Sequence, residues 1–176
     1  LLGEFKGDEK ILMISSSGSS RVVHPEITLH FDDNISHIEK WIPNKPISAI
    51  YFSNNKRKYF LKRFLIENQS KEDFFIEKED KLIHVDLNWR PILMLNFEKV
   101  RGKDPFPDFE INVEEFISVK GYKAQGNQLT SKKIKKVELK ELLPYVDSNE
   151  KNINEIEVLN EEHISSDNES QIKMDI

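Results

Sequence analysis

Two clusters of basic side chains carry the clearest chemical signal in this sequence. The first cluster lies at residues 56–63, where basic residues are interleaved with Tyr59 and Phe60. Its basic members are Lys56, Arg57, Lys58, Lys62 and Arg63. The second cluster lies at residues 116–140, where seven lysines stand against the single acid Glu138, a net charge of +6. Its lysines are Lys120, Lys123, Lys132, Lys133, Lys135, Lys136 and Lys140.

Basic side chains on turns and strand edges can neutralise phosphate groups, because a phosphate contact needs charge but no base readout. Lysines also protect exposed strand edges from aggregation, and charge clusters are commonly no more than solvated faces. The residues alone leave both interpretations open. The candidates for phosphate contact are Lys56, Arg57, Lys58, Lys62, Arg63, Lys120, Lys123, Lys132, Lys133, Lys135 and Lys136.

Other residue types give no pattern of an active site. His24, His30 and His37 lie six and seven residues apart, which fits no zinc spacing. Adjacent acids such as Glu114 and Glu115 would point to opposite faces of a strand. The sequence has no GxSxG, GxxxxGK[ST] or GxGxxG motif, and it has no cysteine. We therefore expect no catalytic residue, metal site or cofactor site within this chain.

Short runs of Val, Ile, Phe and Tyr recur along the chain and predict strands. The predicted strands are residues 10–16, 20–23, 47–53, 57–66, 73–77, 82–87, 92–97, 116–120 and 134–139. Residues 54–56 (Asn-Asn-Lys) predict a turn, because asparagine tolerates a positive φ. No segment before residue 145 keeps a helical apolar period over three turns. The pattern favours an all-β, antiparallel domain, which is a sandwich, a barrel or propeller-like.

The net charge of −5 is an average over two unlike regions. Residues 141–176 contain ten acids and two lysines, whereas residues 1–140 carry a net charge of +3. The composition predicts a folded domain at residues 1–145 and a disordered acidic tail at 146–176. A tail of this charge beside basic residues could compete with phosphate for them. No apolar run approaches the ~18 residues of a membrane span, and no secretory signal is present, so we expect a cytoplasmic location. Because the chain begins Leu1-Leu2, without methionine, we expect a fragment of a larger protein.

Residues 116–139 resemble a blade of the C-terminal β-pinwheel domain of type IIA bacterial DNA topoisomerases, in the A subunit of DNA gyrase and topoisomerase IV. In that family a strand leads into a basic-Gly loop that ends Gly-Asn, followed by a basic strand. Here the loop is residues 120–127 (KGYKAQGN) and the strand begins TSKK at Thr130. Gly121, Gly126 and Asn127 would shape the loop, the glycines by adopting positive φ and by close backbone approach.

The resemblance extends over residues 1–145 and is closest to the form found in Bacteroidetes. It rests also on ILMISSSG at residues 11–18 and on the segments at 45–68 and 86–103. It implies a partial β-pinwheel of two or three blades that binds duplex DNA along its rim. It implies as partners the remainder of the A subunit and the B subunit, which is the ATPase. ATP and Mg²⁺ would act in those other parts of the enzyme, and the protein would be associated with the nucleoid.

Two family features are missing from the sequence. The gyrase box Gln-Arg-Arg-Gly-Gly-Lys-Gly is absent, and no tyrosine lies in the helical context of the DNA-cleaving nucleophile. This chain should therefore bind DNA without cleaving it. The alternative is a β scaffold that docks on other subunits without binding DNA. In that case Trp41 and Trp89 could be interface anchors, although burial in the core is the commoner role of tryptophan.

Overall fold

The computed structural model describes residues 4–26 and 33–145, and these residues form β-strands with one short helix. The predicted all-β class is confirmed, and all pairings between the strands are antiparallel. The strands are β1 (Ile11–Ser15), β2 (Ser19–Val23), β3 (Ile35–Lys40), β4 (Ile47–Ser53), β5 (Lys58–Phe64), β6 (Asp73–Phe74), β7 (Lys81–Asp86), β8 (Pro91–Phe97), β9 (Phe109–Asn112), β10 (Asn127–Thr130) and β11 (Ile134–Leu142). The helix α1 is Val113–Phe116.

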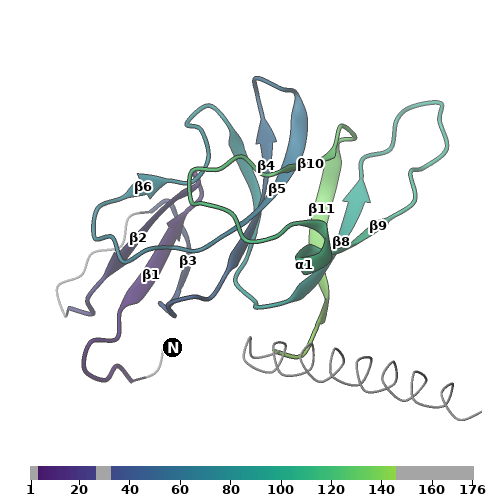
Figure 1. Cartoon of the computed structure of the whole chain (residues 1–176). Coiled ribbons are helices and arrows are strands. Elements are labelled where there is room, and N and C mark those ends of the chain that lie inside the picture. Colours follow the sequence, from purple (N-terminus) through teal and green to yellow (C-terminus); the bar gives the residue numbers. More distant parts are fainter. Residues whose placement is uncertain (1–3, 27–32, 146–176) are drawn as a thin grey trace, which may run out of the picture. The chain divides into compact units, whose positions relative to one another are not determined.

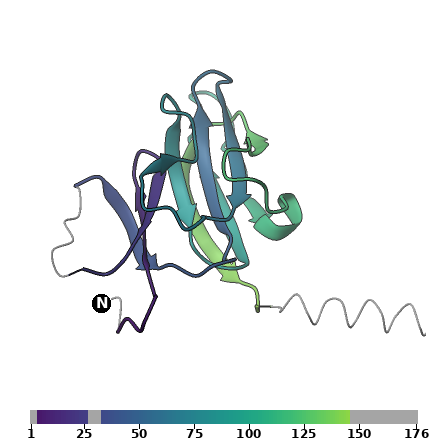
Figure 2. The same ribbon diagram turned by 60° about the vertical axis from the view of Figure 1, so that its left-hand side comes forward.

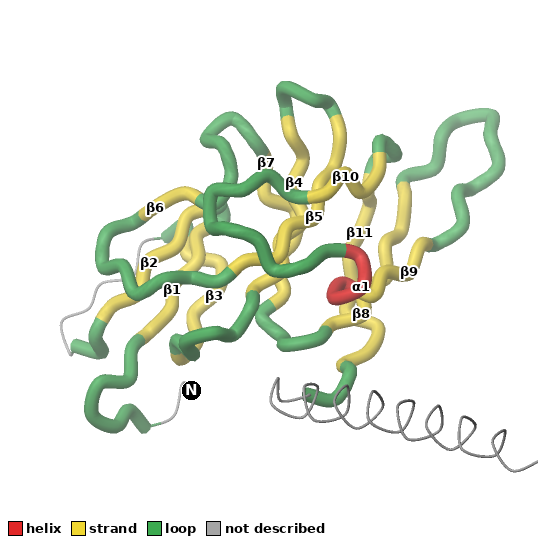
Figure 3. Tube along the Cα trace, in the orientation of Figure 1, coloured by secondary structure: helices red, strands yellow, loops and turns green. Residues whose placement is uncertain are grey.

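The strands form three separate propeller-like sheets, and no closed barrel is formed by the described residues. Sheet A has the strand order β3-β1-β2-β6, sheet B has β10-β5-β4-β7, and sheet C has β11-β8-β9. Figure 1 shows the sheets following one another along the chain, from the purple β1–β2 hairpin to green β11. Figure 3 shows the long loops that connect them.

Each sheet is built on the same plan. A hairpin forms first (β1–β2, β4–β5 or β8–β9), and a later strand (β3, β7 or β11) pairs with the first strand of that hairpin. We call each hairpin with its later strand a repeat. In the second and third repeats, one further strand precedes the later strand in the sequence and pairs with the preceding sheet. Thus β6 pairs with β2 of sheet A, and β10 pairs with β5 of sheet B. Two of the three sheets are therefore completed by a strand that the next repeat donates.

Sheet B lies between two hydrophobic cores. Ile47, Ala49 and Tyr51 belong to the core shared with sheet A, whereas Ile50 belongs to the core shared with sheet C. Because alternate residues of a strand face opposite sides, burial on both sides requires a continuous apolar run. This explains the sequence ISAIYFS of β4, which sits inside the domain in both views (Figures 1 and 2).

Some predicted elements differ from the structure. The predicted strand at 116–120 is wrong, because residues 113–116 form α1 and only Lys120 makes an isolated parallel bridge, to Phe64. Strands β3, β9 and β10 were not predicted, because none of their sequences (ISHIEK, FEIN and NQLT) contains a continuous apolar run. The predicted acidic tail at 146–176 lies outside the described residues, so the boundary at residue 145 stays a prediction.

Candidate nucleic-acid interface

The turn between β4 and β5 and the first residue of β5 present three of the predicted basic residues, Lys56, Arg57 and Lys58. Arg57 itself adopts the positive φ, at 55°, that the sequence pattern assigns to the asparagines. Asn54 instead anchors the turn, because its backbone N–H donates to the Asp80 carboxylate, with N and Oδ1 3.0 Å apart. The turn is thus tied to the segment that leads into β7.

Two glutamines from the third repeat position the lysines of this turn. Lys56 Nζ lies 2.6 Å from Gln125 Oε1, and Lys58 Nζ lies 2.9 Å from Gln128 Oε1. Gln128 lies on β10, the strand donated to sheet B. An amide oxygen is neutral, so these two hydrogen bonds orient the ammonium groups without pairing them with a negative charge.

Lys62 and Arg63 differ from the sequence interpretation, because neither side chain is available to a phosphate at the surface. Lys62 is 1% exposed and Arg63 is 6% exposed. They lie on opposite faces of β5, Lys62 toward the core shared with sheet A and Arg63 toward sheet C. Arg63 Nη2 donates to the backbone oxygen of Trp89 at 3.0 Å, and burial lowers the pKa of its guanidinium. Both residues are therefore structural.

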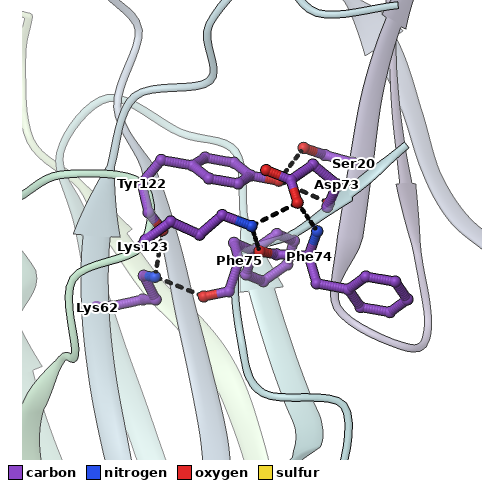
Figure 4. Close-up of polar contacts among 7 residues, drawn as sticks. All are labelled: Ser20, Lys62, Asp73, Phe74, Phe75, Tyr122 and Lys123. Carbon is purple, nitrogen blue, oxygen red and sulfur yellow. Dashed lines mark hydrogen bonds and ion pairs between the residues drawn. The ribbon is translucent and has the colours of Figure 1, made fainter. Parts of the chain in front are cut away.

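Lys62 is the centre of a polar cluster that joins three repeats (Figure 4). Its Nζ donates to the backbone oxygens of Phe75 at 2.6 Å and of Tyr122 at 2.7 Å. The Tyr122 hydroxyl lies 2.9 Å from Ser20 Oγ and donates to the backbone oxygen of Asp73 at 2.7 Å. Burial lowers the pKa of Lys62 to about 8, with a further contribution from nearby Lys123, and burial raises the pKa of Tyr122 to about 12. This cluster holds sheets A and B together, and it encloses Lys62 so that its ammonium group is not available to a ligand.

The lysines of residues 116–140 fall into two classes in the structure. Four of them form ion pairs with carboxylates: Lys123 with Asp73, Lys133 with Glu98, Lys136 with Glu138, and Lys140 with Glu110. The other three, Lys120, Lys132 and Lys135, have no carboxylate partner among the described residues, and Lys132 Nζ lies 4.2 Å from the centre of the Phe106 ring. Three of these acids, Asp73, Glu98 and Glu110, come from outside residues 116–140, so they offset about half of the +6 charge of this segment.

The predicted loop at residues 120–127 has a mainly structural role. Lys120 Nζ donates to Asn127 Oδ1 at 2.7 Å, and Asn127 Nδ2 donates to the backbone oxygen of Phe116 at 3.1 Å. The prediction of positive φ is wrong for Gly121 and Gly126, because the positive-φ glycines of the described residues are Gly7, Gly18 and Gly102. The prediction of close approach is confirmed for Gly126, where a Cβ atom would overlap the carbonyl group of Leu61.

A groove of about 670 Å³ lies between sheets B and C, and we call it the basic groove. Three cations line it, Arg57, Lys81 and Lys133, together with one carboxylate, Glu98. The remaining lining residues are Phe52, Asn54, Tyr59, Ile83, Ser131 and Ile134. The groove thus brings together the turn between β4 and β5, the start of β7, and the turn between β10 and β11.

Several basic residues of this region have no signal in the local sequence. Lys81 lies in the acidic segment EKEDK, so the local sequence does not mark it as part of a basic surface. Only the pairing of β7 with β4 places it beside the other cations of the groove. Lys99, Arg101 and Lys103 are exposed in the loop between β8 and β9. That loop also contains Glu98, Asp104 and Asp108, so its local charge is balanced. This loop and the 54–57 turn each connect the two strands of a hairpin, β8–β9 and β4–β5. A comparison of the two hairpins would have identified these basic residues as candidates.

The described residues contain no group of three or more side chains suited to hold a metal ion. Within the same residues, no helix is long and apolar enough to cross a membrane. Trp41, a candidate interface anchor from the sequence, is partly buried against the core and donates from Nε1 to the backbone oxygen of Ile66 at 3.0 Å. Its placement is that of a core residue.

A comparison with protein-family models shows to which family the chain belongs. The model described as the topoisomerase C-terminal domain of Bacteroidota matches residues 1–141. The chain belongs to this family. No curated protein and no solved structure matched the chain. The chain is therefore a topoisomerase C-terminal domain, a part of enzymes that act on DNA, and the match spans all three sheets of the fold.

Proposed function

We propose that this topoisomerase C-terminal domain binds duplex DNA without sequence preference and presents it to the catalytic parts of its enzyme. The observation that carries the proposal is a set of cations, in turns or in the first two residues of the strands that follow them, that have no carboxylate partner among the described residues. These cations are Lys56, Arg57, Lys58, Lys81, Lys132 and Lys135. Lysines that acids already neutralise would contribute less, because a phosphate would have to displace the acid.

The mechanism is electrostatic. Each phosphate that a lysine or arginine neutralises releases condensed counterions, and this release favours binding irrespective of the base sequence. Contacts to phosphate position the duplex but carry no direct sequence information. Arg57 and Lys133 of the basic groove lie in turns, and Lys81 is the first residue of β7, so their long cationic side chains can reach a duplex that passes over the ends of sheets B and C.

We further propose that the parent chain is the A subunit of a DNA gyrase or topoisomerase IV. The B subunit, which is the ATPase, would be its partner, and ATP and Mg²⁺ would be used outside this chain. Binding to chromosomal DNA would associate the enzyme with the nucleoid. The family membership supports a topoisomerase of some kind, and the finer assignment rests on the resemblance of residues 116–139 to a blade of the A subunit.

A salt titration of DNA binding, followed by fluorescence anisotropy with the full chain, tests the proposal. If about four to six phosphates are neutralised, log K should fall against log salt with a slope of roughly −3.6 to −5.4. A slope near zero, or no binding, would contradict it and favour the β scaffold that docks on other subunits.

Two variants that change the net charge by the same amount sharpen the test. The first replaces four lysines without carboxylate partners by glutamine: Lys56, Lys58, Lys132 and Lys135. The matched control replaces four lysines that form ion pairs: Lys40, Lys123, Lys136 and Lys140. The first variant should lose more affinity and more of the salt slope, equally for two unrelated duplexes. Equal losses in both variants would show that only net charge matters.

A further inference from the structure

The basic groove contains an arginine held in an unfavourable backbone conformation. Arg57 has a φ of 55°, and the only other residue besides glycine with a positive φ among those described is Asn44. The left-handed region is easily adopted by glycine and tolerated by asparagine, but it is strained for a long side chain. Two asparagines, Asn54 and Asn55, occupy the same turn, yet the strained position holds arginine. Strained backbone positions of this kind cluster at functional sites such as ligand clamps.

The guanidinium group of Arg57 has no hydrogen-bond partner or carboxylate partner among the described residues. Its Cζ lies 5.7 Å from the centre of the Phe52 ring, which supports one face of the group. The nearby acids are already engaged. Glu98 forms an ion pair with Lys133 at 2.9 Å, and Asp80 accepts a hydrogen bond from the backbone of Asn54. The planar donors of Arg57 are thus left for a ligand.

Two features of the basic groove favour an anion as that ligand. Its three cations outnumber its single carboxylate, and the hydroxyl of Ser131 adds a neutral donor. A guanidinium binds the oxygens of a phosphate through two parallel hydrogen bonds, which a lysine cannot reproduce. Arg57 therefore matches a phosphate group better than the flexible lysines around it do.

We infer that the basic groove between sheets B and C is a phosphate-binding site in which Arg57 makes the principal contact. This inference deepens the proposed function, on which it rests for its source of phosphate. The phosphodiester of duplex DNA is one source, and a free phosphate compound is another with the same chemistry. Lys81 lies on the groove wall and supplies additional positive charge, whereas the charge of Lys133 is offset by its ion pair with Glu98.

The substitution Arg57→Gly separates a ligand-binding role from a structural one. Glycine relieves the backbone strain and removes the guanidinium, so the melting temperature should be unchanged or higher while DNA affinity falls several-fold. The salt slope should decrease in magnitude by about 1, the contribution of one phosphate contact. Arg57→Lys keeps the charge and the strain but loses the paired donors. It should retain the slope and weaken binding.

Pyrophosphate serves as the probe for a free phosphate source, measured by calorimetry on the full chain and by competition with DNA. Competition that is strong in the wild type and absent in Arg57→Gly would support the site. If DNA binds normally and Arg57→Gly changes neither affinity nor slope, the inference is overturned and the proposed function stands. If the wild type binds pyrophosphate through Arg57 but does not bind DNA, the proposed function fails and the phosphate site remains.

Discussion

The ammonium group of Lys62 lies 2.7 Å from the backbone oxygen of Tyr122, in the middle of the domain and across two repeats of the fold. Lys62 belongs to a strand of sheet B, and the Tyr122 hydroxyl reaches Ser20 in sheet A. The contact between the two sheets therefore contains a charged group. Its protonation and its hydrogen bonds can be tested separately.

The pH dependence of stability should reveal the burial of Lys62. Its pKa is about 8 in the folded chain, below the ordinary 10.5, so between these values the unfolded chain binds more protons. The free energy of unfolding should therefore gain a contribution from Lys62 as pH rises from 8 to 10.5. Tyr122 acts in the opposite direction above pH 10, because its pKa is raised to about 12.

Chemical denaturation of the wild type and of Lys62→Met between about pH 7.5 and 10 measures this contribution to the free energy of unfolding. The range lies roughly between the folded and the unfolded pKa of Lys62. The methionine side chain has a similar volume and does not titrate. The wild type should gain stability relative to the variant as pH rises. Parallel curves for the two proteins would show that Lys62 is not desolvated in the folded chain.

Removing the Tyr122 hydroxyl should weaken the join between sheets A and B. Tyr122→Phe keeps the ring packed on Phe64 and Phe75 but deprives Ser20 Oγ and the backbone oxygen of Asp73 of a partner. We expect a loss of about 1–2 kcal/mol in the free energy of unfolding. A double-mutant cycle with Ser20→Ala provides the control, since coupled residues give non-additive losses. Additive losses would contradict a direct interaction.

Gly126 should not tolerate a side chain. A Cβ atom would overlap the Leu61 carbonyl and lie 3.0 Å from the backbone nitrogen of Lys62, so Gly126→Ala must push β10 away from β5. The expected loss of stability is about 1–3 kcal/mol. Gly121→Ala is the matched control, because a Cβ there has no neighbour within 4 Å and Gly121 has no positive φ. Equal melting temperatures for the two variants would contradict the close approach at Gly126.

Deleting residues 147–176 should tighten DNA binding at low salt. This segment contains nine acids and two lysines, and its attachment to the domain gives it a high effective concentration near the lysines. Anisotropy measurements at low and high salt should show a difference that disappears as salt screens the charges. A variant with the acids changed to asparagine and glutamine controls for length. An unchanged affinity at low salt would leave the segment without a competing role.

The sequence predicts the strands of the central sheet best. The apolar runs of β4 and β5 and the polar turn between them are strong local signals, and the bounds predicted for β4 match the structure. Strand β10 has the polar sequence NQLT and is a strand because β5 lies beside it. A pairing that depends on a segment more than sixty residues earlier leaves no trace in the local pattern.

The assignment of basic residues failed for a related reason. A lysine inside the apolar run KYFLKRF suggests a surface residue, because lysine is seldom buried. In a strand that is covered on both faces, however, every side chain points into a core, so Lys62 and Arg63 are enclosed together. The sequences of β4 and β5 do not alternate between apolar and polar residues, and this pattern indicates strands that are covered on both faces. The carboxylate partners of Lys123 and Lys133 come from distant strands and could not be inferred.

The two donated strands also tie the order of folding to the direction of synthesis on the ribosome. Sheet A acquires its fourth strand only when residues 73–74 have been made, and sheet B acquires β10 only after residues 127–130. At each stage the newest complete hairpin has an open edge, and transiently open edges can pair with other chains. Each repeat thus closes the edge left by its predecessor, which limits the time for which a nascent chain is prone to aggregate.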